Sequence, residues 1–194
     1  MSEDGVARLL RSIQDGARPD YYFFWGHRAS AGYSVGKWCL SQWWTAAFDV
    51  DGVTYRTAEH FMMAEKARLF GDESAVGSIL SAPDPGTAKK HGRAVRGFDE
   101  AVWRSARYPL VVAGNAAKFA QHPALASFLL STGEDVLVEA SPLDTIWGIG
   151  LTHDSPDARS PERWRGLNLL GFALMDVRAG LRAPAGSKHG LRNA

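Results

Sequence analysis

Apolar and polar positions change their period several times along the chain, and each change marks a predicted element. Residues 5–14 follow a helical period, whereas residues 21–25 form a short aromatic run that is typical of a strand. A helical period returns after residue 57 and recurs up to residue 181. The pattern predicts several helices, one hairpin and two further short strands, with no internal repeat and no second domain.

The segment 47–56 carries the clearest hairpin signal. Asp51-Gly52 lies between two apolar-alternating runs, and this dipeptide favours the type I′ turn that matches the twist of the strands. Thr57 follows as the natural N-cap of a helix, which places Glu59 in its first turn. A carboxylate there is stabilised by the exposed amides and the helix dipole by roughly 0.3–1 kcal/mol. This position favours an ionised Glu59 that acts as a base, nucleophile or cation stabiliser.

Glu59 and Lys66 are expected to lie on one face of this helix. At about 100° per residue the two side chains fall within about 20° of each other, roughly 10 Å apart along the axis. Met62, Met63 and Phe70 share that side. Burying a carboxylate and an ammonium in an apolar stripe is costly unless the two charges pair with each other or take part in the function. A structural ion pair and a catalytic pair both remain open from this stretch alone.

The later predicted elements are mostly helical. Pro109 interrupts the longest of them, so a kink or a new start near Tyr108 is expected. The elements are helices at 74–80, from Asp99 to Phe119, at 124–130 and at 167–181, and a strand at 135–140. The domain organisation predicted is an N-terminal extension at 1–20, one domain at 21–182 and a disordered tail at 183–194.

Composition and charge narrow the class of protein. The 194 residues fit one sizeable core, and the formal net charge of +1 supplies no footprint for tight, non-specific nucleic-acid binding. Cys39 is the only cysteine, and the histidines lack metal-ligand spacing, so neither a disulfide nor a metal site is expected. The acidic N-terminus leads into no long apolar run. A cytoplasmic protein without a membrane partner is therefore the expectation.

Three segments carry candidate binding chemistry. Residues 36–44 are dense in Trp and include Ser41 and Trp44, which suits a site wall or a core corner equally. Residues 86–96 hold a basic cluster with Lys90 and Arg93, which is either a solvated face or a phosphate-binding segment. The loop 141–150 places Asp144 and Trp147 on a turn constrained by Pro and Gly.

The acids suggest one reaction class. Glu59 and Asp144 lie on separate elements beside clustered Trp and a basic run. Two carboxylates with aromatic walls suit hydrolysis at an anomeric carbon, where one acid stabilises positive charge or activates water. No P-loop, no G-x-S-x-G elbow and no dinucleotide-binding glycine motif competes with this interpretation.

Four short motifs, in order along the chain, resemble the NADAR (YbiA-like) family. The first is YRTAEHF at 55–61, followed by Lys66, and the second is AKFAQHP at 117–123. The third is DTIWG at 144–148, and the last is GLNLLG at 166–171 with LMDVR at 174–178. The resemblance covers residues 23 to about 178.

The resemblance implies an α+β, helix-rich fold with a small β-hairpin or sheet. It also implies an N-glycosidase without metal or cofactor, which hydrolyses the bond between a ribose anomeric carbon and an exocyclic amino nitrogen. Two substrate classes follow from the family: phosphorylated ribosylamino-pyrimidine intermediates of riboflavin synthesis, and ADP-ribose attached to guanine in nucleic acid. The family's essential acid corresponds to Glu59, and its late-loop Asp and Trp to Asp144 and Trp147. Lys66, Trp103 and Ser41 match further family positions.

Roles are assigned to these residues as hypotheses. Glu59, Asp144 and Lys66 are the expected catalytic residues, with Lys66 either tuning Glu59 or attacking a ring-opened sugar. Asp144 orients a ribose hydroxyl or assists the leaving amine. The expected substrate-binding residues hold a phosphate, stack on the base or line the site, and they are Ser41, Trp44, Lys90, Arg93, Trp103 and Trp147.

The chain departs from the short bacterial members in two segments. The segment from Arg28 to Cys39 is longer and richer in aromatic residues. The aromatic segment at 33–44 favours the bulkier ADP-ribosyl-guanine substrate slightly over the riboflavin intermediates. The basic stretch is Gly92-Arg93-Ala94-Val95-Arg96 in place of a Gly-Arg-Asp-Arg-like motif. A non-catalytic ADP-ribose or nucleotide-binding module and a protein that binds nucleic acid by contact alone are the competing interpretations.

Overall fold

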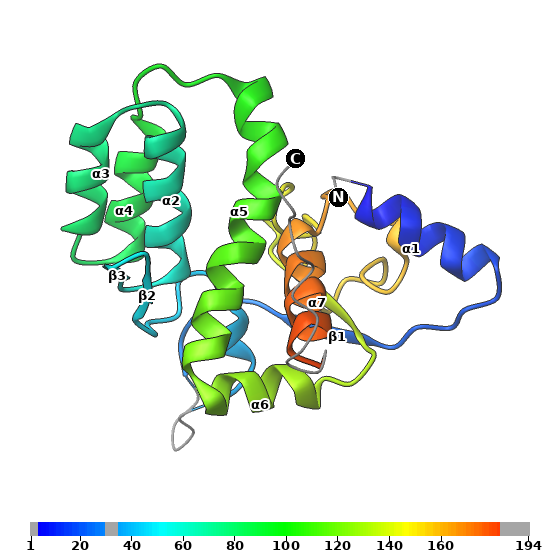
Figure 1. Ribbon diagram of the computed structural model, residues 1–194. Coiled ribbons are helices and arrows are strands. Elements are labelled where there is room, and N and C mark those ends of the chain that lie inside the picture. The colour runs from blue at the N-terminus through cyan, green and yellow to red at the C-terminus, as the bar shows by residue number, and fades with distance from the viewer. Residues whose placement is uncertain (1–3, 30–34, 183–194) are drawn as a thin grey trace, which may run out of the picture.

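Helix α5 (Glu100–Gln121) separates the molecule into two groups of elements (Figure 1). The computed structural model describes residues 4–29 and 35–182. On one side lie α2 (Ala58–Leu69), α3 (Glu73–Leu80) and α4 (Pro85–Arg93), which we call the α2–α4 group. On the other side lies the α7 group, whose elements are α1 (Gly5–Gln14), β1 (Tyr21–Phe24), α6 (Pro123–Ser131), β4 (Val136–Glu139), η2 (Pro161–Arg163) and α7 (Leu169–Arg182). The expected α+β, helix-rich fold is confirmed.

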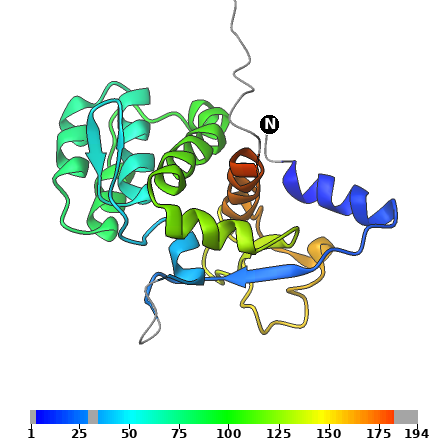
Figure 2. The ribbon, with the colours of Figure 1, turned by 60° about the horizontal axis from the view of Figure 1, so that its bottom comes forward.

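Each group carries one two-stranded sheet. Strands β2 (Phe48–Val50) and β3 (Val53–Tyr55) pair antiparallel, and Asp51 and Gly52 between them have φ of 49° and 78°. Two positive φ angles are what a type I′ turn requires, so the predicted hairpin is confirmed. Strand β1 pairs with β4 in parallel, with Phe24 opposite Glu139. Figure 2 shows the two sheets well apart, the hairpin beside the α2–α4 group and β1 near α7.

Helix α2 is buried around almost its whole circumference, because the β2–β3 hairpin and the helices α3, α4 and α5 all contact it. Thr57 caps it as predicted, since its side chain accepts a hydrogen bond from the His60 amide. On the α5 side the approach is close: a Cβ added to Gly114 would lie 2.4 Å from the Phe61 ring. A helix enclosed in this way carries even its polar residues into the interior.

Helix α5 runs as one helix through Pro109, so of the two expected outcomes, a kink or a new start near Tyr108, the new start is wrong and the kink stays a prediction. Proline in a helix interior costs about 3 kcal/mol, because a hydrogen bond is lost and the ring meets the preceding turn. Contacts on both sides of the proline offset this cost. The Tyr108 hydroxyl donates to Asp176 of α7 at 2.8 Å, and Val111 is buried in the core.

Other parts of the chain were not predicted or are not tested by the structure. Residues 37–40 form a short 3-10 helix, η1 (Lys37–Leu40), which the hydrophobic pattern did not predict. The expected tail at 183–194 lies outside the described residues, and the predicted domain boundaries stay predictions. Within the described part of the chain, no helix combines the length and the apolar character needed to cross a bilayer.

Candidate active site

A cavity of about 460 Å³ opens between the α2–α4 group and the loop that follows β4. Its walls combine three carboxylates, two basic side chains and three tryptophans. The lining residues are Trp25, Gly26, His27, Ser41, Gln42, Trp43, Glu59, Met62, Lys89, Arg93, Glu139, Ser141, Leu143, Asp144, Trp147 and Leu170. The chemistry predicted from distant parts of the sequence therefore meets in one place.

Glu59 lies in the wall of this cavity and is 2% exposed. Its amide donates to the Gln42 carbonyl at 3.0 Å, which fixes the start of α2 against residues 41–43. Burial raises the pKa of Glu59 to about 7, although Lys89, a hydrogen bond from the Trp43 side chain and Arg93 act in the opposite direction. The ionised state expected from the first-turn position is therefore incomplete at neutral pH, because loss of hydration outweighs the helix dipole.

Glu139 is a further carboxylate of the cavity that the sequence analysis missed. It is the last residue of β4, its amide donates to Asn168 Oδ1 at 3.0 Å, and its carbonyl accepts from the Ile149 amide. Burial, together with the nearby Asp144 and Glu59 carboxylates, raises the pKa of Glu139 to about 8, although Lys89 acts in the opposite direction. An acid at the carboxyl end of a buried strand, just before the Asp144 loop, was the available signal.

The Asp144 loop is held by its own side chain. Asp144 Oδ1 accepts from the amides of Ile146 at 2.9 Å and Trp147 at 2.7 Å. Gly148 comes next in the loop. A Cβ at this position would lie 2.8 Å from the Glu139 carbonyl oxygen, so only glycine fits between the loop and the strand. This turn presents Asp144 and Trp147 to the cavity together.

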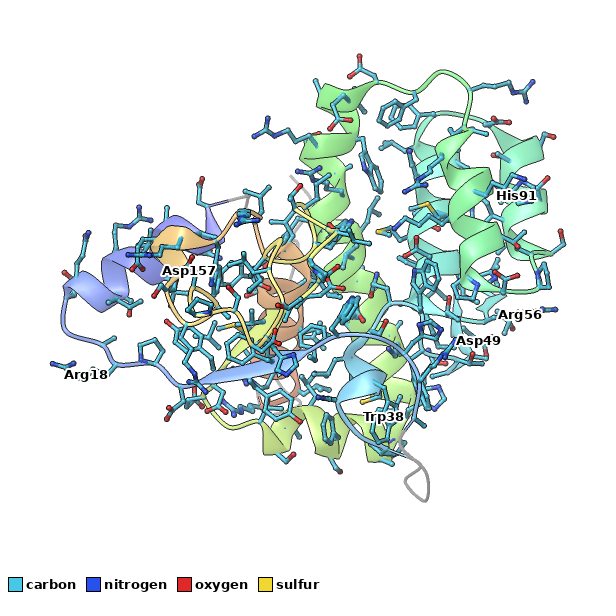
Figure 3. The ribbon with its side chains drawn as sticks, turned by 180° about the vertical axis from the view of Figure 1, so that it is seen from behind. Arg18, Trp38, Asp49, Arg56, His91 and Asp157 are labelled. Atoms are coloured by element: carbon cyan, nitrogen blue, oxygen red, sulfur yellow. The ribbon has the colours of Figure 1, made fainter. Side chains whose placement is uncertain are left out.

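Helix α4 supplies the positive charge. Lys89 and Arg93 line the cavity, and the Lys89 ammonium lies 5.8 Å from the centre of the Trp43 ring. Positions four apart share a helix face, whereas Lys90, the predicted phosphate ligand, is turned about 100° away and is exposed. Figure 3 shows His91 likewise on the side of α4 that faces away from α5.

The segment 41–43 forms the wall opposite the loop. Ser41 and Trp43 line the cavity, and the Trp43 amide donates to Ser41 Oγ at 3.1 Å. Trp44 does not line the cavity: the centre of its ring lies 6.4 Å from that of Trp38, which Figure 3 labels near the bottom of the view. Trp44 lines a separate hollow of about 250 Å³ instead.

Helix α5 braces this wall from behind. The buried Lys118 ammonium donates to the carbonyls of Cys39 at 2.7 Å and Ser41 at 3.2 Å. Asn115 donates to the Gln42 side-chain oxygen at 2.7 Å. Burial lowers the pKa of Lys118 to about 8. These two residues fix the backbone that carries Ser41, Gln42 and Trp43.

The comparison with known proteins assigns the family. The family model of the NADAR domain matches residues 23–182. The chain belongs to the NADAR family. It is similar to N-glycosidase R617 of Acanthamoeba polyphaga mimivirus, with 40% identity over 163 residues that cover 81% of this chain and 94% of that protein. N-glycosidase YbiA of Escherichia coli (strain K12) is 33% identical over 129 residues, 66% of this chain and 72% of that protein.

Two further similarities concern fold and relatives. The NMR structure of E. coli YbiA matches this NADAR fold with a TM-score of 0.66 and 26% identity, over 91% of this chain and 94% of that chain. The chloroplastic riboflavin biosynthesis protein PYRR of Zea mays is 35% identical over 136 residues, 66% of this chain but 20% of that protein. The family resemblance drawn from the motifs is thus confirmed.

Two residues selected from the NADAR motifs lie outside the cavity. The Lys66 ammonium lies 4.1 Å from the centre of the Phe98 ring and 5.6 Å from that of Trp103. Lys66 is 9% exposed, and burial lowers its pKa. Two turns of α2 therefore separate its amine from the Glu59 carboxylate, and Trp103 contributes to enclosing the amine.

Of the predicted site residues of this NADAR domain, the cavity brings together Ser41, Glu59, Arg93, Asp144 and Trp147, and it leaves out Trp44, Lys66, Lys90 and Trp103. Trp43, Lys89 and Glu139 line it in addition. Within residues 4–29 and 35–182, no cluster of three or more His, Cys, Asp or Glu side chains is arranged to hold a metal ion.

Proposed function

We propose that this protein is an N-glycosidase that hydrolyses the bond between a ribose anomeric carbon and an exocyclic amino nitrogen. One observation carries the proposal: the buried Glu59 carboxylate lines a cavity that also holds two cationic and three indole side chains. A cavity of about 460 Å³ lies in the range that holds small ligands. The mimivirus and E. coli relatives named N-glycosidase support the same reaction class.

The cavity gives each part of such a substrate a partner. Lys89 and Arg93 supply point charge and forked donors for a phosphate. Trp43 and Trp147 offer flat apolar faces to the base or the ribose. Glu59, in its ionised form, accepts a proton from the attacking water or stabilises positive charge at the anomeric carbon. Asp144 orients a ribose hydroxyl with the carboxylate oxygen that its turn does not use.

We further propose ADP-ribose attached to the guanine amino group as the substrate. The cavity rim carries Trp25, 54% exposed, and Leu143, 91% exposed, which offer apolar contact to parts of a substrate that extend beyond the cavity. The aromatic segment at 33–44 supports this choice less than expected. Of its described tryptophans, Trp43 lines the cavity, whereas Trp38 and Trp44 pack on each other.

Phosphorylated ribosylamino-pyrimidines are the second candidate substrates. The observation that favours them is the maize relative named as a riboflavin biosynthesis protein. Such a compound needs one phosphate site and one base-stacking face, and Arg93 and Trp147 meet both needs. The same cleavage chemistry serves either substrate.

The deciding experiment offers the purified protein both substrates and follows release of free ADP-ribose or ribose 5-phosphate. We expect turnover of the ADP-ribosylated guanosine, and loss of that turnover in Glu59→Gln with the fold kept, because the amide is isosteric but cannot accept the proton. Ligand binding with no product from either substrate would indicate a binding module instead. DNA affinity with a steep salt dependence, and no hydrolysis, would indicate binding by contact alone.

A further inference from the structure

Two carboxyl groups of the cavity each have an oxygen with no hydrogen-bond partner. Glu59 Oε1 and Glu139 Oε2 are both buried and unpaired among the described groups. They arrive from unrelated elements, the first turn of α2 and the last residue of β4, and line the same cavity. Buried acids that repel each other do not both ionise, so the pair holds a proton to higher pH than either acid would alone.

Burial and the Asp144 carboxylate favour the neutral form of Glu59, but three neighbouring groups oppose them and favour its charged form. Lys89 and Arg93 attract the carboxylate from α4, and the Trp43 side chain donates a hydrogen bond to it. Each of these interactions stabilises an anion and is weakened when the anion is protonated. Glu59 is therefore the member of the pair that more readily releases the proton.

The surroundings of Glu139 favour its neutral form. Its charged neighbours are the Asp144 and Glu59 carboxylates, both of which repel a second negative charge, and Lys89, which opposes them more weakly. His27, the remaining titratable lining residue, is exposed on the segment after β1. Of the two acids, Glu139 therefore holds its proton to the higher pH.

We propose that Glu139 is a second catalytic residue, the general acid that protonates the leaving amine. This inference rests on the proposed N-glycosidase function. As the bond between the anomeric carbon and nitrogen breaks, its electron pair passes to nitrogen, which takes the Glu139 proton. Water adds to the anomeric carbon and gives its proton to Glu59. The products are the free amine and the ribose hydroxyl, and proton return from Glu59 to Glu139 restores the enzyme.

The test is the pH dependence of kcat in three variants. The wild-type profile should be bell-shaped, falling on the acidic side as Glu59 gains a proton and on the alkaline side as Glu139 loses one. Glu139→Gln should lower kcat by about 10²–10⁴-fold, change KM little and abolish the alkaline limb. Glu139→Asp keeps an acid and should retain the limb with an intermediate kcat. The control Glu134→Gln, which removes an exposed carboxylate paired with Arg182, should leave the profile unchanged.

A titration of the free protein gives a readout besides activity. With ¹³C-labelled glutamate side chains, NMR should show two carboxyl groups titrating near pH 7 and 8, and one of them should vanish in Glu139→Gln. A fully ionised Glu139 at pH 7 would overturn the proposal even where the variant fails to fold. If the wild-type protein is active and Glu139→Gln has the same pH profile, the role of Glu139 as general acid is wrong but the N-glycosidase function stands. If the wild-type protein cleaves neither substrate, both the proposed function and the role of Glu139 are wrong.

Discussion

At the scale of single residues, burial decides the ionisation of the cavity acids. Position in the first turn of α2 favours charge on Glu59 by less than about 1 kcal/mol, whereas a change of one pKa unit corresponds to about 1.4 kcal/mol. Burial raises the pKa of Glu59 to about 7 and that of Glu139 to about 8. The site thus holds acids that change protonation near neutral pH, as acid–base catalysis requires.

The first prediction concerns stability against pH. The folded protein keeps protons on Glu59 and Glu139 at pH values where the unfolded chain has released them, so the free energy of unfolding falls as pH rises. From pH 5 to pH 7 we expect the double variant Glu59→Gln/Glu139→Gln to gain about 4 kcal/mol relative to the wild type, about 2 kcal/mol for each acid. Urea unfolding at each pH measures this. Burial lowers the pKa of His60, so this residue makes the free energy of unfolding rise with pH in both proteins. The difference between the wild type and the double variant therefore reports the two acids alone.

The second prediction compares neighbouring lysines on α4. Lys89 lines the cavity and Lys90 does not, although the two are adjacent and are the same residue type. Loss of a charge-assisted contact to phosphate costs about 1.5–3 kcal/mol, so Lys89→Ala should weaken ADP-ribose binding by about 10–150-fold. Lys90→Ala should bind as the wild type does. Equal effects of the two substitutions in calorimetry would show that α4 is not the phosphate site.

Which face a residue takes was the hardest feature to predict from sequence. The basic cluster and the Trp-dense segment were candidate binding segments, and both line the cavity, but Lys90 and Trp44 were chosen where Lys89 and Trp43 line it. One residue along a helix rotates the side chain by about 100°, and in an extended segment it reverses the direction. Local composition does not determine which of two neighbouring side chains points into the cavity, because that depends on how distant elements pack together.

At the scale of elements, α5 approaches α2 closely at Gly114. Gly114 has no room for a methyl group against Phe61, whereas Gly77 in α3 has nothing within 4 Å of the same added atom. The two glycines therefore form a natural pair for measuring how much the contact matters.

The third prediction uses this pair. Gly114→Ala should destabilise the protein by about 1–3 kcal/mol, because the helices must separate to admit the methyl group. Gly77→Ala should stabilise it by about 0.5–1 kcal/mol, because alanine restricts the unfolded chain and favours an exposed helix interior. Thermal and urea unfolding of both variants measure the difference. Two changes of the same sign would contradict the close contact.

Elements that depend on neighbouring residues were predictable, and those that depend on distant ones were not. The Asp51-Gly52 turn and the Thr57 cap follow from local backbone chemistry, and both are confirmed. The parallel pairing of β1 with β4 joins segments more than a hundred residues apart, and no local pattern encodes it. Glu139 was missed for this reason, since only that pairing, with the packing of α7, carries the end of β4 to the cavity.

At the scale of the whole molecule, the cavity spans both groups of elements. Lys89 and Arg93 come from the α2–α4 group, whereas Asp144 and Trp147 follow β4 in the α7 group. A ligand that contacts all four links the two groups and stabilises the folded state by mass action, by about 2.7 kcal/mol at a hundred times its dissociation constant.

The fourth prediction follows from that link. ADP-ribose should slow amide hydrogen exchange in α4 and in residues 144–150 together, and should raise Tm. Exchange in α1, which lies on the far side of the α7 group in Figure 1, should not change. Protection confined to one of the two segments would show that the ligand does not bridge them.

The start of α2 has one last consequence, for how readily this protein changes its substrate. The Glu59 amide donates a hydrogen bond to the Gln42 carbonyl, and the His60 amide donates one to the Thr57 side chain. These two donors are therefore not available to bind a phosphate. Among the described lining residues, the lysine and arginine side chains both belong to α4. Under the proposed function, the side chains that bind the anion and those that hydrolyse the bond therefore lie on different elements, so substitutions on α4 can change the substrate range while the carboxylates stay the same.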